Sequence, residues 1–363
     1  ESVVFFLITG EITEVYVSEL KSIDAIEEDN DDDDDEEDEE DDDYYYSDEE
    51  EILEELEKLE VGEDDNENFE NPNCGIYAPL LNYLPFDIAT DIPESHKFFD
   101  ASDSDLNPRT IRAIMRDWNL LKKNIPAGIF VRVSESKIDL LQVLIIGPRN
   151  TPYHDGVFVF DVFYPNDYPL RPPKFFFHCV NGVQFNPNLY PEGDICLSLL
   201  GTWDGKGTEM WNPRTSTLLQ VILSIQGLIL GTEEPYFLEA GFDKRKGSAV
   251  GNIHSLRYNP TAILGSLWHS LKSYQIAKTE TVYCTELNEI ILTHLTMCST
   301  APDRIRKYLE YIEKNPDSSN KELYDLLGFP FESSAGFNQQ LAHFLEQHAL
   351  KLTSSMRKKA NKS

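Results

Sequence analysis

The middle of this chain reads Phe185-Asn-Pro-Asn-Leu-Tyr-Pro-Glu-Gly-Asp-Ile-Cys196-Leu-Ser-Leu-Leu-Gly-Thr-Trp203. Residues 179–214, which contain this sequence, show neither the alternation of a strand nor the spacing of an amphipathic helix. The Asn, Pro and Gly residues favour turns instead. Because irregular stretches of this length are uncommon inside compact domains and are usually functional, we expect the chemistry of the protein to lie here.

Cys196 is the candidate nucleophile of this stretch. Polar Asn186, Asn188 and Ser198 lie close to it in the sequence and would give a reactive thiol hydrogen-bonding neighbours. The alternative is that Cys196 is a small apolar side chain packed in a core, as most free cysteines are. The spacing of the residues leaves both interpretations open.

Regular patterns flank the irregular stretch on both sides. Asn107 followed by Pro108 predicts a helix start, and four strands separated by turns follow it: Ile129–Val133, Ile138–Ile146, Val157–Phe163 and Lys174–His178. After the irregular stretch, helical spacing returns at Thr215–Leu230 and then at 244–258, 260–277 and 280–298. This order predicts an α+β fold, with an N-terminal helix, a four-stranded antiparallel meander, an active-site loop and C-terminal helices.

Acidic residues are concentrated near the start of the chain. The whole chain has a net charge of −34, and residues 1–70 carry 34 acidic and two basic side chains. Residues 29–43 are almost entirely Asp and Glu, which predicts an extended, disordered tract. Repulsion from phosphate argues against nucleic acid or anionic membrane as a partner of this tract, whereas basic proteins suit it.

Five segments are expected along the chain. They are a fragmentary strand segment at 1–26, the acidic tract with a short helix (Glu51–Glu60) at 27–70, an extended segment at 71–106, the catalytic domain at 107–298 and a helical appendage at 299–363. The appendage contains three helical patterns, at 302–314, 320–327 and 337–353, which either pack back on the domain or bind a partner.

Cysteine usage limits the class of protein. Five cysteines without a Cys-x-x-Cys pair argue against a disulfide framework and a zinc module, so we expect no metal and no cofactor. No apolar run approaches the roughly 18 residues that a membrane span needs. We therefore expect a protein of a reducing compartment, the cytoplasm or the nucleus.

Several motifs resemble ubiquitin-conjugating (E2) enzymes. They are Gly147-Pro-x-x-Thr-Pro-Tyr153-x-x-Gly156, Tyr164-Pro-x-x-Tyr168-Pro-x-x-Pro172-Pro173, Asn186-Pro-Asn188, Gly193-x-Ile-Cys196 and Trp211-Asn-Pro213. The likeness covers roughly residues 107–280 with every block in order. The sequences around Leu189-Tyr190, Leu200-Gly201-Thr202-Trp203 and Glu234-Pro235-Tyr236 look closest to the large hybrid E2/E3 class, of the ubiquitin-conjugating enzyme O and giant BIR-domain type. The resemblance implies the UBC fold.

The resemblance also implies roles for residues of the loop. Cys196 would accept ubiquitin from an ATP-dependent E1 as a thioester and pass it to lysines of protein substrates. Asn188 would stabilise the oxyanion or shape the loop, and it also reads as a turn residue after Pro187. Asn186 stands where ordinary E2s have His, so a supporting role through hydrogen bonds is expected.

Two departures from the family pattern leave the deprotonation of the incoming lysine open. Ser198 stands where many E2s carry Asp, and the acidic gate loop of many E2s corresponds here to Glu233–Glu239. Tyr236 and Glu239 are candidates for assisting the lysine, with surface or packing roles as the alternative.

Partner contacts follow from the resemblance as well. Lys122 and Lys123 on the first helix suit an acidic E1 surface, although a solvated helix face explains them equally well. Leu170 and Pro213 match loops that contact an E3, and the hybrid class implies that a separate E3 is dispensable. Ubiquitin, E1 and protein substrates, basic ones among them, are the expected partners.

Two other functions remain as alternatives. The first is a non-catalytic ubiquitin-binding module on the same fold, against which the presence of Cys196 with Asn188 argues. The second is a chaperone for histones or other basic proteins, in which the acidic tract would be the functional part.

Overall fold

The structure is a computed structural model that describes residues 3–6, 12–15, 78–90, 92–102, 106–203, 209–316 and 318–360. The chain divides into two compact units, Glu1–Pro72 and Asn73–Ser363. In the first unit, β1 (Val3–Phe6) pairs antiparallel with β2 (Ile12–Val15). The predicted acidic tract and the predicted helix at Glu51–Glu60 lie outside the described residues. Within the described ranges, no helix has the length and apolar character to span a membrane.

Helix α3 (Pro108–Asn124) begins where the sequence predicts it. The side chain of Asn107 caps the helix by accepting a hydrogen bond from the Thr110 backbone N–H at 2.9 Å, and Pro108 occupies the first turn. Its buried face presents Ile114, Trp118 and Leu121 to the sheet. Burying side chains of this size contributes roughly 2 kcal/mol each, so this face fixes the helix on the sheet.

The second unit contains a five-stranded sheet in the order β3-β4-β5-β6-β7. The predicted meander is present as β4 (Ile129–Ser134), β5 (Leu140–Ile146), β6 (Val157–Phe163) and β7 (Lys174–Phe177), each pair antiparallel. Strand β3 (Phe86–Ala89) was not predicted; it pairs parallel with β4 and makes the sheet mixed. The Val131 backbone N–H, which donates to the Pro85 carbonyl at 2.7 Å, begins this pairing.

The segment before α3 lies along the domain. The Lys97 backbone N–H donates to the Asp161 carboxylate at 2.8 Å, and the Ser102 hydroxyl donates to Asp139 at 2.6 Å. Because these carboxylates are buried, the bonds satisfy charges that would otherwise be costly to desolvate. The sheet and its edge therefore include residues before position 107.

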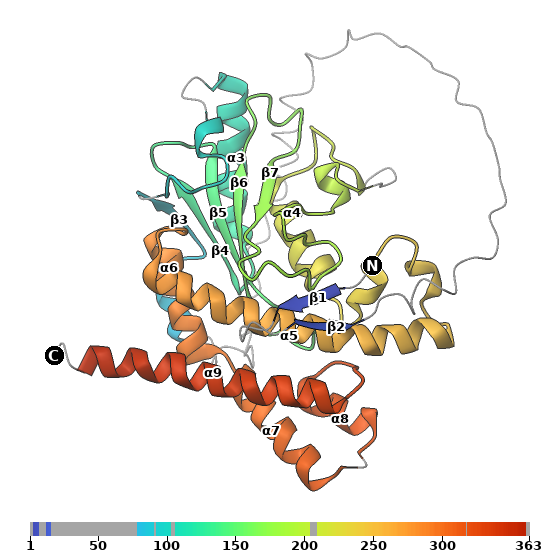
Figure 1. Ribbon diagram of the computed structural model, residues 1–363. Helices are drawn as coiled ribbons and strands as arrows, with labels where there is room; N and C mark the ends of the chain where they lie inside the picture. Colours follow the sequence, from blue (N-terminus) through green and yellow to red (C-terminus); the bar gives the residue numbers. More distant parts are fainter. Residues whose placement is uncertain are drawn as a thin grey trace, which may run out of the picture. The chain divides into compact units, whose positions relative to one another are not determined.

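Both faces of the sheet are covered (Figure 1). Val131, Val143 and Phe160 face one core, which includes residues of α3 and of α4 (Leu218–Ser224). Their neighbours Phe130, Leu144 and Val159 face a second core, closed by the end of α5 (Ala249–Thr279) and by α6 (Thr285–Thr293). This two-sided burial explains why β5 and β6 are apolar nearly throughout.

The helix predicted at Thr215–Leu230 is present in a shorter, divided form. Thr217 and Gln220 form a capping box at the start of α4. The helix widens after Ser224 into a π-helical turn, η5 (Ile225–Ile229), in which the Leu230 N–H bonds to the Ile225 carbonyl at 3.0 Å. The chain then enters the 3-10 turn η6 (Pro235–Leu238).

The sequence predicts two helices, at 244–258 and 260–277, and this prediction is wrong. Helix α5 runs unbroken from Ala249 to Thr279 with Pro260 inside it. Proline lacks the N–H that would bond to the carbonyl of Leu256, four residues earlier. That carbonyl instead accepts the backbone N–H of Glu332 at 2.8 Å. A segment distant in the sequence therefore compensates for the proline.

The three helices predicted in the appendage are confirmed as α7 (Ala301–Lys314), α8 (Asn320–Leu327) and α9 (Ala335–Ala360). They pack against Ile263, Leu267 and Leu271 of α5 and form a third core with it. Figure 1 shows α9 running along α5. The shorter elements are η1 (Ala78–Asn82), η2 (Phe99–Ala101), η3 (Ser198–Leu200), η7 (Asp243–Arg245) and the π-helical η8 (His294–Cys298).

Candidate active site

The loop that carries Cys196 is held by short-range backbone pairing. Leu189 forms isolated bridges with Asn186 and with Ile195, and a tight turn lies between them. In that turn the Tyr190 N–H bonds to the Asp194 carbonyl at 3.0 Å, and Gly193 has a φ of +100°. A Cβ on Gly193 would lie 2.1 Å from the Phe176 ring, so only glycine fits. The irregular sequence therefore encodes a defined loop.

Cys196 stands between two buried neighbours. Ile195 and Leu197 point into the core, whereas Cys196 is only half-buried and can be reached from solvent. Its backbone N–H donates to the Asn188 carbonyl at 3.0 Å, and the Asn188 side-chain amide donates to the Cys196 carbonyl at 2.9 Å. The backbone that carries the thiol is thus fixed from both sides by Asn188.

Asn186 is fully buried and braces the loop through three hydrogen bonds. Its Nδ2 donates to the Tyr153 hydroxyl at 2.9 Å and to the Ile229 carbonyl at 3.0 Å, and its Oδ1 accepts the Asn188 N–H at 2.8 Å. Every polar atom of this side chain is used. An amide suits this position because it donates and accepts at the same time.

Asn188 combines a committed donor with an unused acceptor. Its Nδ2 is bound to the Cys196 carbonyl, while its buried Oδ1 has no hydrogen-bond partner among the residues that the structure describes. The residue therefore shapes the loop in this structure.

Tyr190 belongs to the site and was not predicted from the sequence. Its hydroxyl lies 3.6 Å from Cys196 Sγ, within hydrogen-bonding range of sulfur. This hydrogen bond, together with partial burial and the charge of Glu239, raises the pKa of Tyr190 to about 12. The hydroxyl therefore keeps its proton at neutral pH and can donate to a thiolate. Its place six residues before Cys196, within the Asn-Pro-Asn-Leu-Tyr motif, is the sequence pattern that points to it.

The two candidates in the gate loop lie differently. Glu239 is exposed, and its negative charge adds to the raised pKa of Tyr190 and, after burial, to that of Tyr258. Tyr236 is buried, and its hydroxyl pairs with His254 Nδ1 at 3.1 Å, so the structure directs it to α5.

The remaining predicted residues lie away from the thiol or beside it on the loop. Ser198 begins the turn η3, two residues after the cysteine. Lys122 and Lys123 are exposed in the last turn of α3. Leu170 is 52% exposed, and Pro213 is half-buried. The loops of Leu170 and Pro213 are joined because Trp211 Nε1 donates to the Pro169 carbonyl at 2.8 Å.

The other cysteines are less suited to nucleophilic chemistry. Among the described residues, Cys284 and Cys298 are buried and Cys179 is half-buried. Burial raises the pKa of the thiols of Cys179 and Cys298. A raised pKa leaves less of the reactive thiolate at neutral pH. No group of three or more His, Cys, Asp or Glu side chains in the described part of the chain is arranged to hold a metal ion.

The fold and this loop define a class of protein. A helix, an antiparallel meander with one parallel edge strand and a braced cysteine loop make up the UBC fold. Residues 113–246 match the family model described as "Ubiquitin-conjugating enzyme". The chain therefore contains a ubiquitin-conjugating (E2) domain.

Curated relatives give the same result. The chain is 47% identical over 184 residues to the probable ubiquitin-conjugating enzyme E2 23 of Arabidopsis thaliana, which covers 50% of this chain and 16% of that protein. It is 42% identical to the putative E2 39 of the same plant, over 52% of this chain and 62% of the relative. It is also 42% identical to the human dual E2/E3 enzyme BIRC6, over 44% of this chain and 3% of that protein. The chain thus spans less than two thirds of each of these relatives.

Proposed function

We propose that this chain accepts ubiquitin from an E1 as a thioester on Cys196 and transfers it to lysine side chains. The observation that carries the proposal is the half-buried thiol of Cys196, held on a loop that Asn186 and Asn188 brace within a ubiquitin-conjugating domain. A non-catalytic module would have no use for an accessible thiol on so rigid a loop.

Loading of Cys196 is a transthiolation. The Cys196 thiolate attacks the thioester carbonyl of E1-bound ubiquitin, a new C–S bond forms, the bond to the E1 cysteine breaks, and the E1 thiolate leaves. The Cys196 proton passes to solvent before attack. The hydrogen bond from the protonated Tyr190 hydroxyl, 3.6 Å away, then stabilises the thiolate.

Transfer to lysine is an aminolysis. The neutral amine attacks the thioester carbonyl, and the oxygen gains negative charge as the tetrahedral intermediate forms. The Asn188 amide, which here donates to the Cys196 carbonyl, would turn to donate to this charge. The intermediate then breaks its C–S bond and returns the thiolate, which Tyr190 again stabilises. Glu239, whose negative charge acts on Tyr190, would attract the lysine ammonium and accept its proton before attack, and the nitrogen loses its second proton to solvent as the amide forms.

An E1 charging assay with ubiquitin and with several ubiquitin-like modifiers tests the proposed function. With E1, ATP and ubiquitin, the chain is expected to form an adduct that a thiol reductant removes. The same assay with other ubiquitin-like modifiers and their own activating enzymes is expected to give little or no adduct. Efficient charging with another modifier and none with ubiquitin would reassign the substrate, and no adduct with any modifier would refute the proposal.

We extend the proposal in two ways. The first is that the chain transfers ubiquitin without a separate E3, and the second is that it prefers basic substrates. The 42% identity to a dual E2/E3 enzyme supports the first, and the −32 net charge of residues 1–70 supports the second. We expect transfer to a lysine-rich basic protein without added E3, slowed when residues 27–51 are deleted and when salt is raised. An unchanged rate and salt dependence after the deletion would leave the tract without a role in substrate choice, and transfer only with E3 would contradict the first expectation.

A further inference from the structure

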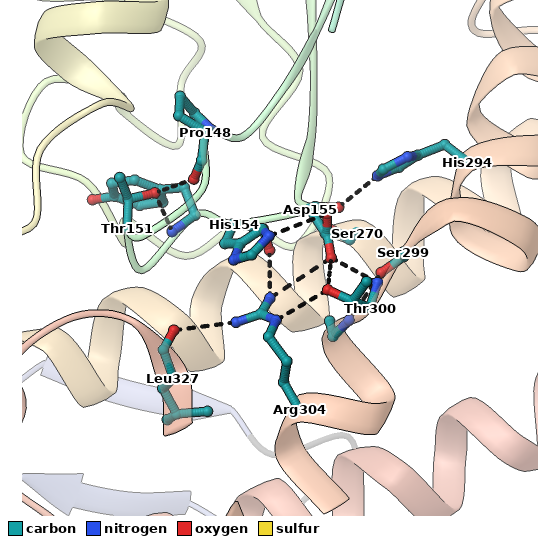
Figure 2. Close-up of polar contacts among 12 residues, drawn as sticks. Pro148, Thr151, His154, Asp155, Ser270, His294, Ser299, Thr300, Arg304 and Leu327 are labelled. Atoms are coloured by element: carbon teal, nitrogen blue, oxygen red, sulfur yellow. Dashed lines mark hydrogen bonds and ion pairs between the residues drawn. The ribbon is translucent and has the colours of Figure 1, made fainter. Parts of the chain in front are cut away.

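Besides its apolar packing on α5, the helical appendage is bound to the E2 domain by one buried carboxylate, that of Asp155 (Figure 2). Asp155 lies between β5 and β6 and is 2% exposed. Its Oδ2 accepts both the backbone N–H and the hydroxyl of Thr300, each at 2.7 Å. Thr300 is the residue that precedes α7, so the carboxylate of Asp155 satisfies the start of that helix from a distant part of the chain.

Arg304 and His294 complete the cluster around Asp155. The Arg304 guanidinium lies 3.7 Å from Asp155 Oδ2, donates to the Thr300 hydroxyl at 3.2 Å and to the His154 carbonyl at 3.2 Å. His294 Nε2 lies 2.9 Å from the Asp155 carbonyl oxygen. Burial alone would raise the pKa of Asp155, but His154, Arg304, His294 and Thr300 together hold it below its usual value. The carboxylate is therefore charged, paired and fixed.

The loop that carries Asp155 is tight enough to pass a displacement on to Tyr153. The Gly156 N–H bonds to the Tyr153 carbonyl at 2.8 Å, and a Cβ on Gly147 would lie 1.8 Å from that same carbonyl oxygen. Asp155 itself has a φ of +64°, in the left-handed region that costs a residue other than glycine some strain. The bonds to Thr300 and Arg304 hold it there.

Tyr153 connects this loop to Cys196 through a series of hydrogen bonds. Its buried hydroxyl accepts the Nδ2 donation of Asn186, and Asn186 holds the backbone of Asn188, which holds Cys196. A second contact joins the appendage to the gate loop, because Asn259 Nδ2 donates to both the Glu233 and the Pro330 carbonyls. Hydrogen bonds thus link the appendage to the loop that contains Tyr153–Gly156 and, through Asn259, to the gate loop.

We propose that Asp155 is a positioning residue for transfer from Cys196, through which helices α7–α9 hold the Tyr153–Asn186–Asn188 chain in place. The proposal rests on the proposed function of Cys196. It assigns the appendage a role within the catalytic unit, where the sequence left open whether it binds a partner. Asp155 touches no reacting atom and acts only through the loop.

Substitution of Asp155 by glycine removes the carboxylate while keeping a residue that adopts positive φ freely. In Asp155→Gly, single-turnover discharge of a preformed ubiquitin thioester to free lysine is expected to slow by about tenfold, which corresponds to the loss of one or two buried hydrogen bonds. The amount of thioester formed with E1 is expected to stay near that of the wild type. Asp155→Asn keeps the acceptor for Thr300 and is expected to recover most of the discharge rate.

Two further variants test the route through Tyr153. Tyr153→Phe removes the hydroxyl that Asn186 contacts and is expected to slow discharge by about fivefold. If Asp155 acts through Tyr153, the two substitutions are not independent. The fold-slowing of discharge in the double variant Asp155→Gly/Tyr153→Phe is then smaller than the product of the fold-slowings in the two single variants. Thr300→Val, which removes one donor at constant volume, gives a milder test should Asp155→Gly fail to fold.

Asn150→Gly is the matched control. Asn150 lies in the same loop with a φ of +60°, and its replacement leaves the bonds of Asp155 intact. The discharge rate of the Asn150→Gly variant is expected to equal that of the wild type. Normal loading with unchanged discharge in Asp155→Gly would overturn the inference. Equal losses of loading and discharge in that variant would overturn it too, and so would independent effects of the two substitutions in the double variant. Absence of loading in the wild type would instead refute the proposed function, and the inference with it.

Discussion

Replacing Cys196 with serine is expected to convert the ubiquitin adduct from one that thiol reductants remove into one that resists them. A serine hydroxyl forms an oxygen ester, whose C–O bond does not exchange with thiols. The adduct should also accumulate more slowly, because a hydroxyl is a weaker nucleophile than a thiolate. Cys196→Ala is expected to abolish the adduct entirely. Denaturing electrophoresis with and without reductant measures both outcomes.

Cys179→Ser is the matched control for this prediction. Cys179 is half-buried like Cys196 and lies in the same irregular part of the chain, but burial raises its thiol pKa. The Cys179→Ser variant is expected to form the reducible adduct at the wild-type rate. An adduct that survives Cys196→Ala and disappears in Cys179→Ser would move the nucleophile to Cys179.

Replacing Asn188 with alanine is expected to slow discharge of the thioester to lysine by about 100-fold, a loss typical of removing one oxyanion donor. Loading by E1 is expected to fall much less. In that step the Cys196 thiolate is itself the nucleophile, and the reaction depends less on the position of the loop. Tyr190→Phe, which removes only the hydroxyl that pairs with Cys196 Sγ at 3.6 Å, is expected to slow discharge by about fivefold. Single-turnover discharge over a range of lysine concentrations separates binding from chemistry.

A purely structural role for Asn188 predicts a different result. Its side chain also holds the Cys196 carbonyl, so its loss relaxes the loop. In that case loading and discharge would fall together, and the midpoint of thermal unfolding would drop with them. Discharge that falls alone, with an unfolding midpoint close to that of the wild type, would support the oxyanion role.

Local chemistry made much of the fold predictable. Asn107 with Pro108 marks the start of α3 because capping and the fixed φ of proline act within one turn. The strands of the meander follow from apolar residues between turns. Strand β3 could not be predicted, because its four residues follow Pro85 and gain their pairing from β4, some forty positions later. The continuity of α5 through Pro260 likewise depends on Glu332, far along the chain.

The candidate active site, like the fold, could be predicted only in part. Cys196, Asn188 and Asn186 were predicted as site residues from the resemblance to E2 enzymes, and the structure brings them together on one loop. Tyr190 was missed because its role depends on a distance to sulfur that spacing alone does not give. Tyr236 and Glu239 are close in sequence, yet burial of Tyr236 against His254 directs their side chains to different surroundings. Side-chain contacts that the spacing of residues does not reveal decide these cases.

The mass of the intact chain after charging with E1, ATP and ubiquitin tests the central claim most directly. We expect a gain of one ubiquitin less one water that a thiol reductant removes and that cleavage and mass analysis locate on Cys196. No mass gain, or a gain that persists when Cys196 is alanine, would contradict it.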